Sequence, residues 1–295
     1  METTATYDDK TQEFIVNTPT TLSQKYWITN GAVHANQALV FAQTIVKGKR
    51  EGVNAFLVPI RDSKLQKFPG VEINEMGNKI GLNGVDNAAL LFHNVRIPRT
   101  NMMNKYADVD EKGTFACDVK GIQQRFFKVT ERLLSGRLCI ASMTLGGLKR
   151  CIYTTLKYSK QRMGVSPNGK SETPIFEYQL QKNALIPIIS RMLGLNMLHN
   201  FAKGVFANPK GHEHDLLMIC CVDKTLIGWH SDRAIATMRE RCGGQGFLGA
   251  NGFGEAIAAS HAAMTAEGDN RVLMVKVVKD MLTIFSKNPE AYYNG

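Results

Sequence analysis

The sequence predicts an α+β fold, with a small antiparallel, β-barrel-like domain first and an α-helical bundle after it. Residues 12–98 contain short runs rich in β-branched and aromatic residues, separated by Gly, Asn and Asp. From about residue 120 the apolar residues recur at steps of three and four, which is the period of a helix. We expect the boundary within residues 106–121, with a β-domain over residues 1–110 and a helical domain over residues 120–295.

The β-domain contains three clear strand candidates. Gln37–Val46 and Val53–Ile60 are predicted strands, and residues 47–52 between them form a hairpin connection. Ala88–Ile97 is a further strand candidate. The Asn and Gly residues of segment 78–87 predict turns, because these residues tolerate positive φ at little cost.

The helical domain contains four long helices by its apolar pattern. They are predicted over residues 138–152, 185–195, 213–240 and 270–286. Pro187 must kink or restart the second helix, because proline has no N–H to donate. A run of long helices after a strand-rich region predicts a bundle.

Composition places the chain among soluble globular proteins, since 44% of its 295 residues are hydrophobic and 21% are charged. No apolar run reaches about 18 residues and the first 24 residues are polar, so we expect no membrane span, no secretory signal and an intracellular location. The net charge of +10 is compatible with small anionic ligands. We do not expect nucleic-acid binding, because no nucleic-acid module is recognisable.

The cysteines and histidines do not predict a metal site. The six cysteines are scattered without metal-type spacing, which predicts free thiols in a reducing compartment. Cys220 and Cys221 are adjacent, and a buried helix face is favoured over a redox role for them. His212 and His214 lack the i, i+4 spacing of helical zinc ligands, so we interpret that segment as a solvated loop.

Two local motifs carry candidate chemistry. Segment 265–273 places Glu267 just ahead of an apolar helix, and segment 242–246 is a glycine cluster some twenty residues earlier. Each has a structural alternative. Asp269 or Asn270 can serve as the N-cap of the following helix, and the glycines can form a helix C-cap and turn.

The order and spacing of several motifs resemble those of the acyl-CoA oxidases, sisters of the acyl-CoA dehydrogenases. The resemblance covers nearly the whole chain and is carried by Glu2–Asp8, Lys25–Gly31, Lys79–Asn87, Val95–Arg99, Ser135–Arg137, Arg162, Gln181, the glycine cluster and the Glu267 segment.

The resemblance implies an FAD-dependent flavoenzyme of fatty-acid β-oxidation and lipid metabolism. Such an oxidoreductase converts a fatty acyl-CoA to trans-2-enoyl-CoA and reduces O2 to H2O2, and FAD must accept the hydride because no side chain does so. Glu267 is the implied catalytic base, which must be partly desolvated to remove an α-proton.

Two alternatives remain open. The Glu-Gly-Asp-Asn segment at 267–270 resembles oxidases, whereas Trp-Ile-Thr-Asn at 27–30 resembles dehydrogenases, which pass electrons to a carrier flavoprotein. The other alternative is an inactive, truncated protein that binds FAD or CoA and acts by association, because likeness of fold does not establish chemistry.

The resemblance also assigns binding residues. The implied FAD-binding residues are Trp27, Thr29, Arg162, Gln181, Gly243, Gly244, Gly246 and Asp269. Trp27 would stack on the flavin and Thr29 would hydrogen-bond its edge. Arg137 is implied to lie near the active site or to bind acyl-CoA, and the structural alternative is a helix-surface Arg paired with Glu131 or another carboxylate.

Arg162 and Gln181 are implied to reach the cofactor of a neighbouring subunit, which predicts a homodimer. Val165 stands where the family often has an aromatic residue. The family's chains also have a helical domain before this region and another after it, so the resemblance predicts a fragment. It implies a peroxisomal location, although no Ser-Lys-Leu type signal is present and the location is otherwise cytoplasmic.

Overall fold

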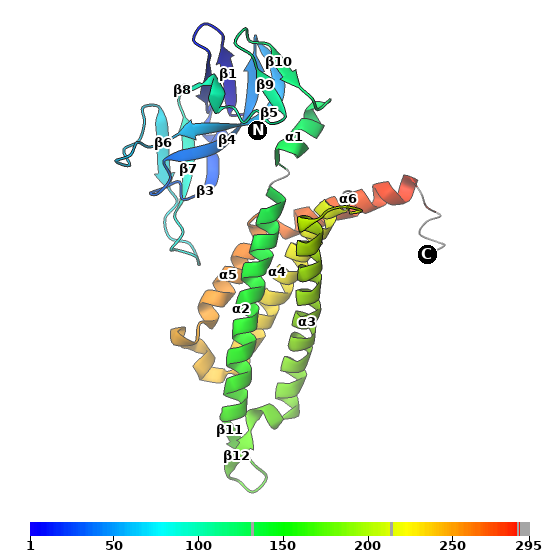
Figure 1. Cartoon of the computed structure of the whole chain (residues 1–295). Helices are drawn as coiled ribbons and strands as arrows, with labels where there is room; N and C mark the ends of the chain where they lie inside the picture. The colour runs from blue at the N-terminus through cyan, green and yellow to red at the C-terminus, as the bar shows by residue number, and fades with distance from the viewer. Residues whose placement is uncertain (131–132, 213–214, 288, 290–295) are drawn as a thin grey trace. The chain divides into compact units, whose positions relative to one another are not determined.

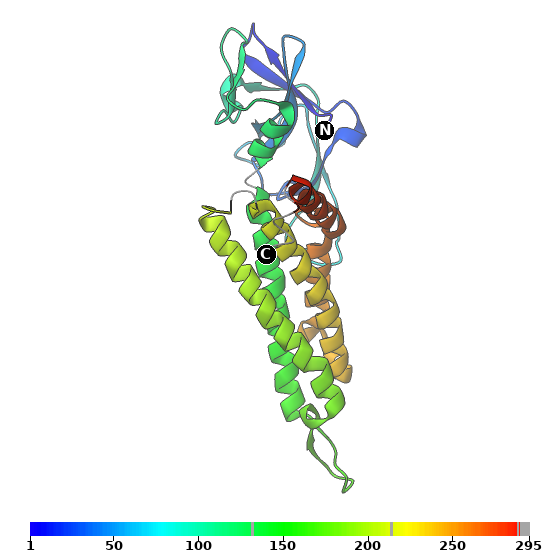
Figure 2. The same cartoon turned by 90° about the vertical axis from the view of Figure 1, so that its right-hand side faces the viewer.

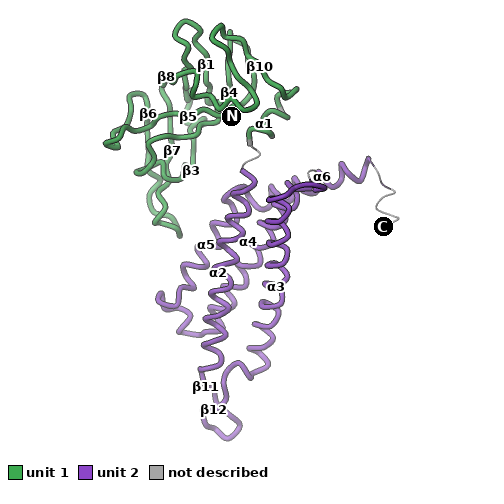
Figure 3. The backbone as a smooth tube through the Cα atoms, in the orientation of Figure 1, with its two compact units in different colours: residues 1–132 green, residues 133–295 purple. Residues whose placement is uncertain are grey.

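The computed structural model describes residues 1–130, 133–212, 215–287 and 289. The chain divides into two compact units, Met1–Arg132 and Leu133–Gly295 (Figure 3). The first is built mainly from strands and the second mainly from helices. The predicted α+β class, with a small β-domain before a helical bundle, is therefore confirmed.

The first unit contains a five-stranded sheet in the order β5-β4-β1-β2-β8. Its strands are β1 (Thr4–Asp8), β2 (Glu13–Asn17), β4 (Gln37–Val46), β5 (Lys49–Pro59) and β8 (Val95–Pro98). All neighbouring pairs are antiparallel except β1 and β4, which are parallel.

Smaller sheets complete this unit. A three-stranded antiparallel sheet contains β3 (Lys25–Thr29), β7 (Asn87–Phe92) and β6 (Val71–Glu75). The short strands β9 (Ala107–Val109) and β10 (Phe115–Cys117) pair with one another, and helix α1 (Ile122–Thr130) follows.

The predicted hairpin between residues 47 and 52 is confirmed, but it is tighter than expected. Strands β4 and β5 pair up to Val46 and Lys49, and Lys47 and Gly48 form the turn with φ of +48° and +78°. Two consecutive residues with positive φ match the twist of antiparallel strands, so the pairing can continue to the turn.

The core of the first unit is aromatic at its centre. Phe14, Phe56 and Phe92 are fully buried, and the rings of Phe14 and Phe56 meet edge to face with centroids 4.9 Å apart. In β1 and β2 partly buried and buried residues alternate, as expected for strands with one face on a core.

The helices of the second unit are α2 (Leu134–Gln161), α3 (Gln179–Ala207), α4 (Leu216–Arg241), α5 (Phe253–Thr265) and α6 (Asn270–Lys287). Helices α2, α3 and α4 run alongside one another in a bundle, whereas α6 lies across one end of them (Figures 1 and 2). Helix α4 contacts each of the other four. A hairpin of β11 (Met163–Val165) and β12 (Ser171–Pro174) joins α2 to α3.

Helix α3 continues through Pro187 as one helix, so the predicted restart does not occur. The carbonyl of Asn183 lacks its usual N–H donor there. Because Asn183 is exposed, water can satisfy this carbonyl and reduce the cost of the proline.

Apolar and polar contacts both hold the bundle together. The predicted stripe of α2 is buried at Leu145 and Leu148 and packs in one core cluster with residues of α3, α4 and α5. His199 of α3 connects three helices, since its Nε2 lies 2.6 Å from Ser142 Oγ of α2 and its Nδ1 lies 2.8 Å from Asp223 Oδ2 of α4. In the described part of the chain, no helix has the length and apolar character to cross a membrane.

Candidate active site

Glu267 lies in the turn between α5 and α6. Its φ is +57° and that of Gly268 is +112°, so the chain reverses through two consecutive residues with positive φ. The left-handed conformation costs a non-glycine residue roughly 1–2 kcal/mol. Surrounding contacts must therefore hold the turn in place.

The carboxyl group of Glu267 rests against Gly136 of α2. A Cβ atom built on Gly136 would lie 2.5–2.7 Å from the carboxyl carbon and both carboxyl oxygens. Any side chain at this position would displace the carboxylate. Gly136 therefore provides the space that Glu267 occupies.

Arg137 contacts the same turn from α2. Its Nε donates a hydrogen bond to the Glu267 carbonyl at 3.2 Å, and its Nη1 lies 3.6 Å from Cys221 Sγ. Within residues 1–130, 133–212 and 215–287, no carboxylate forms an ion pair with this guanidinium. The alternative pairing with Glu131 lies outside the described residues.

Lys224 of α4 also contacts this turn. It is 1% exposed, and its Nζ donates to the Gly268 carbonyl at 2.6 Å and to Asn270 Oδ1 at 2.7 Å. Burial lowers the pKa of Lys224 to about 8, while nearby Asp269 raises that pKa and Arg137 lowers it. Two cationic side chains therefore hold the backbone of the Glu267 turn.

Asp269 caps helix α6. Its Oδ1 accepts hydrogen bonds from the N–H groups of Arg271 at 2.9 Å and Val272 at 3.1 Å. The N-cap interpretation of Asp269 is thus confirmed, and its contact with FAD stays a prediction. Asn270 is buried and is bound by Lys224.

The glycine cluster forms the short 3₁₀ segment Gly243–Phe247 after α4. Gly243 has a φ of +56°, and a Cβ at Gly246 would lie 2.2 Å from the Arg239 carbonyl oxygen, so the fold itself requires glycine at both positions. Gly244 is exposed, has no positive φ, and a Cβ there would meet no atom within 4 Å. A ligand can approach the backbone at Gly244.

Arg162 and Gln181 differ in their availability to a ligand. Arg162 follows α2 and is exposed, and its side chain has no partner in the part of the chain that the structure describes. Gln181 is buried, and its Nε2 donates to Ser159 Oγ at 2.8 Å and to the Arg241 carbonyl at 3.2 Å. Gln181 thus holds α3 against the end of α4 beside the glycine cluster. Val165 is 65% exposed.

Trp27 and Thr29 belong to the first unit, on β3. The register between β3 and β7 shifts between Lys25 and Ile28, and Trp27 has a φ of +60° within this irregularity. Trp27 is 57% exposed and Thr29 is exposed, so neither packs into the core. Irregularities of this kind redirect side chains and are common beside active sites.

The structure brings part of the predicted site together. Glu267, Arg137 and Asp269 meet around one turn of the second unit, and Gly136 and Lys224 of the same cluster were not predicted. Gly136 lies just before the predicted helix 138–152, and its local signal is its place in the Ser135–Arg137 motif. Lys224 carries no comparable local signal, because its contacts come from residues far along the chain.

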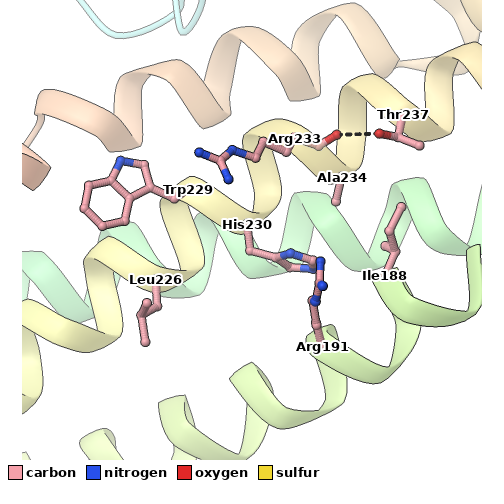
Figure 4. A pocket seen from close by; sticks show the side chains of 8 residues that line it. All are labelled: Ile188, Arg191, Leu226, Trp229, His230, Arg233, Ala234 and Thr237. Carbon is pink, nitrogen blue, oxygen red and sulfur yellow. Dashed lines mark hydrogen bonds between the residues drawn. The ribbon is translucent and has the colours of Figure 1, made fainter. Parts of the chain in front are cut away.

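A separate open pocket of about 340 Å³ lies between α3 and α4 (Figure 4). Arg191 and His230 point toward one another in it, and Trp229 and Arg233 contribute further lining. Burial lowers the pKa of His230. None of the predicted site residues lines this pocket.

The described residues contain no group of three or more side chains that could hold a metal ion. Glu213 and His214, in the segment interpreted as a solvated loop, lie outside the described residues. All six cysteines are free, and Cys220 and Cys221 are both buried, as predicted for a helix face. Burial raises the pKa of Cys220 to about 11, so its thiol is protonated at neutral pH.

Two family models match the chain in the order of its two units. The acyl-CoA dehydrogenase middle domain matches residues 1–95, and the acyl-CoA oxidase C-alpha1 domain matches residues 131–282. The first match places the chain in the acyl-CoA dehydrogenase and oxidase class. The second covers just over half of the chain, and the chain belongs to the acyl-CoA oxidase family.

Relatives and solved structures agree with this assignment. Peroxisomal acyl-coenzyme A oxidase 2 of Arabidopsis thaliana is 37% identical over 96% of this chain and 42% of its own length. An acyl-CoA oxidase structure from tomato matches 98% of this chain and 46% of its own, with 28% identity and a TM-score of 0.87. The structure of acyl-CoA oxidase-2 of Caenorhabditis elegans, bound with FAD, ascaroside-CoA and ATP, matches 100% of this chain and 46% of its own, with 26% identity and a TM-score of 0.85. The chain spans less than half the length of these proteins.

Proposed function

We propose that this chain is the part of an FAD-dependent acyl-CoA oxidase that carries the catalytic base, Glu267. The whole protein would convert a fatty acyl-CoA to trans-2-enoyl-CoA and reduce O2 to H2O2. The observation that supports this most directly is the Glu267 carboxylate seated against Gly136, in a turn bound by Arg137 and Lys224.

The chemistry requires removal of a proton from the carbon beside a thioester carbonyl. A carboxylate does this when water is excluded from it and when its geometry is fixed. Glu267 is exposed in this chain, and a bound acyl group would cover it. The contacts of Arg137 and Lys224 fix the backbone, so the carboxylate meets the substrate in one orientation.

The residues present fit an FAD cofactor. FAD, when bound, supplies the hydride acceptor for the β-carbon and passes electrons to O2. Exposed Trp27 would stack on a flavin ring and Thr29 would bind the edge of that ring. In the second unit, open Gly244 would meet phosphates or ribose, and the unpartnered guanidinium of Arg162 would reach the cofactor of a neighbouring subunit. Gln181 would support the glycine cluster indirectly, since its amide already donates a hydrogen bond to the Arg241 carbonyl just before the cluster.

The remaining proposals concern location and assembly. The relative from Arabidopsis thaliana is named as peroxisomal, and we place the present protein in the peroxisome on that basis. A homodimer is proposed because Arg162 is exposed and lacks a partner within the described residues, as expected for a side chain that reaches a neighbouring subunit.

The test compares the FAD-loaded chain with its Glu267→Gln variant during anaerobic mixing with a long-chain acyl-CoA. Loss of the visible flavin absorbance should be roughly 10²–10⁴-fold slower in the variant, because a general base contributes that much. Glu255→Gln is a matched control, since Glu255 is an exposed carboxylate of α5 away from the turn.

Equal rates in the wild type and Glu267→Gln would contradict the assignment of the base. Admission of air then identifies the acceptor. Formation of H2O2 supports the oxidase, whereas reduction of a carrier flavoprotein without H2O2 would show a dehydrogenase.

A further inference from the structure

We propose that Lys224 is a positioning residue for Glu267: it fixes the backbone of the turn so that the carboxylate stays seated at Gly136. The catalytic part of this inference rests on the proposed function. The structural part, that Lys224 holds the turn, stands on its own and can be measured in the chain without cofactor.

Burial of a lysine ammonium group costs free energy because the group loses its hydration. Lys224 is 1% exposed within the bundle, next to the buried Cys221 and Thr225. An apolar side chain of similar length would fill the space without loss of hydration. A buried ammonium group is expected only where it meets acceptors that need it.

Both acceptors of Lys224 lie directly after Glu267 in the chain. The Gly268 carbonyl belongs to the residue with φ of +112°, and Asn270 begins helix α6. Lys224 therefore binds the turn on the C-terminal side of Glu267. Arg137 binds the carbonyl of Glu267 itself. Together they hold a backbone conformation that a glutamate rarely adopts.

The direction of the Glu267 side chain depends on the backbone conformation of the turn. In the left-handed conformation the side chain leaves the turn toward α2, where only a glycine leaves room for the carboxyl group. A turn that relaxed to negative φ would carry the carboxylate away from Gly136. The two hydrogen bonds that Lys224 donates go to the Gly268 carbonyl and to Asn270, so Lys224 positions the Glu267 side chain through the turn.

The experiment uses hydrogen–deuterium exchange on the purified chain with Lys224→Met, which keeps the length and removes the donor. We expect backbone amides of segment 266–270 to exchange about tenfold faster, since a charged hydrogen bond contributes that much protection. The rest of α2, α3 and α4 should be unchanged. Lys276→Met is the matched control, because Lys276 pairs with Asp280 within α6.

A second variant tests the same contact if Lys224→Met folds poorly. Asn270→Ala removes one of the two acceptors and should raise exchange in the same segment by a smaller factor. Unchanged exchange at 266–270 in both variants, or a uniform increase across the bundle, would overturn the proposal.

The kinetic readout then tests the catalytic part. With FAD-loaded protein, Lys224→Met should lower kcat roughly 10–10²-fold with little change in KM, because it misplaces the base without removing substrate contacts. An unchanged kcat in a variant with faster exchange would overturn the catalytic part. If Glu267→Gln also leaves flavin reduction unaffected, the proposed function fails, and the exchange result still decides whether Lys224 holds the turn.

Discussion

Glu267 shows how a reactive side chain depends on residues that are distant in the sequence. Its turn is bound by Arg137 of α2 and Lys224 of α4, and its carboxyl group occupies the space left by Gly136. The local sequence around Glu267 identifies a carboxylate before a helix. Only the tertiary contacts give that carboxylate a defined position.

Gly136 provides a direct test of this arrangement. Gly136→Ala should raise the free energy of unfolding by roughly 0.5–1 kcal/mol, because alanine favours the helix more than glycine does. The added methyl group should displace the Glu267 carboxylate and slow flavin reduction by roughly 10²-fold. Urea denaturation and anaerobic acyl-CoA mixing measure the two effects.

Gly146→Ala is the matched control, since a Cβ at Gly146 of the same helix would meet no atom within 4 Å. It should stabilise the helix and leave the reaction rate unchanged. If Gly136→Ala also kept the full reaction rate, the position of the Glu267 carboxylate against Gly136 would not matter for the reaction.

The pKa of Lys224 predicts a pH dependence of stability. Its folded-state pKa of about 8 is below the ordinary value of 10.5, so the unfolded chain binds more protons between these values. The wild type should therefore gain stability relative to Lys224→Met as pH rises from about 8 to 10.5. Lys25, whose pKa is also lowered to about 8, is present in both proteins. Its contribution therefore cancels in the difference between their free energies of unfolding.

Urea denaturation of both proteins at several pH values measures this difference. A constant difference across the window would mean that Lys224 is hydrated in the folded chain, contrary to its burial.

Residue-scale prediction from the sequence succeeded where the signal was local. Asp269 was one of two N-cap candidates, beside Asn270, because both residue types are favoured as caps before an apolar helix. Lys224 and Gly136 could not be assigned, since their roles depend on the packing of three helices. The seven histidines gave no usable pattern, although His199 proves to bridge Ser142 and Asp223.

At the scale of single elements, the start of α6 can be tested through its cap. Asp269→Ala should lower the free energy of unfolding by about 1 kcal/mol, because two N–H groups lose their acceptor. Asp269→Asn keeps an acceptor oxygen and should retain most of the stability. Equal losses in the two variants would show that the negative charge, not the cap, stabilises the helix.

The glycine cluster offers a matched pair of variants. Gly246→Ala should destabilise the chain by about 1–3 kcal/mol, because its Cβ would overlap the Arg239 carbonyl. Gly244→Ala should leave stability unchanged and weaken FAD binding, since only a ligand would meet the added methyl group. Thermal melting and flavin fluorescence separate these effects. Unaltered FAD affinity in Gly244→Ala would place the cofactor elsewhere.

Element prediction depended on length and periodicity. The long helices were recognised because their apolar stripes extend over several turns. Helix α5 was missed, since its alanines and glycine provide few large apolar residues to mark a face. The five-residue strands β1, β2 and β6 were not predicted individually.

At the scale of the whole molecule, the strand-rich and helical halves were predictable because the period of the apolar pattern changes between them. The first compact unit extends to Arg132, beyond the segment 106–121 expected from composition. Helix α1 belongs to this unit, and contacts such as that of Arg125 with the Glu51 carbonyl at 3.0 Å explain why. Such long-range contacts cannot be inferred from local composition.

The measurement that tests the central claim most directly is the visible spectrum of the purified chain after FAD loading and gel filtration, before and after addition of a long-chain acyl-CoA. We expect retained flavin that bleaches with acyl-CoA, and we expect this bleaching to be lost in Glu267→Gln. Retained flavin that acyl-CoA does not reduce, or an equal response in Glu267→Gln, would contradict the assignment of Glu267 as the base of an acyl-CoA oxidase.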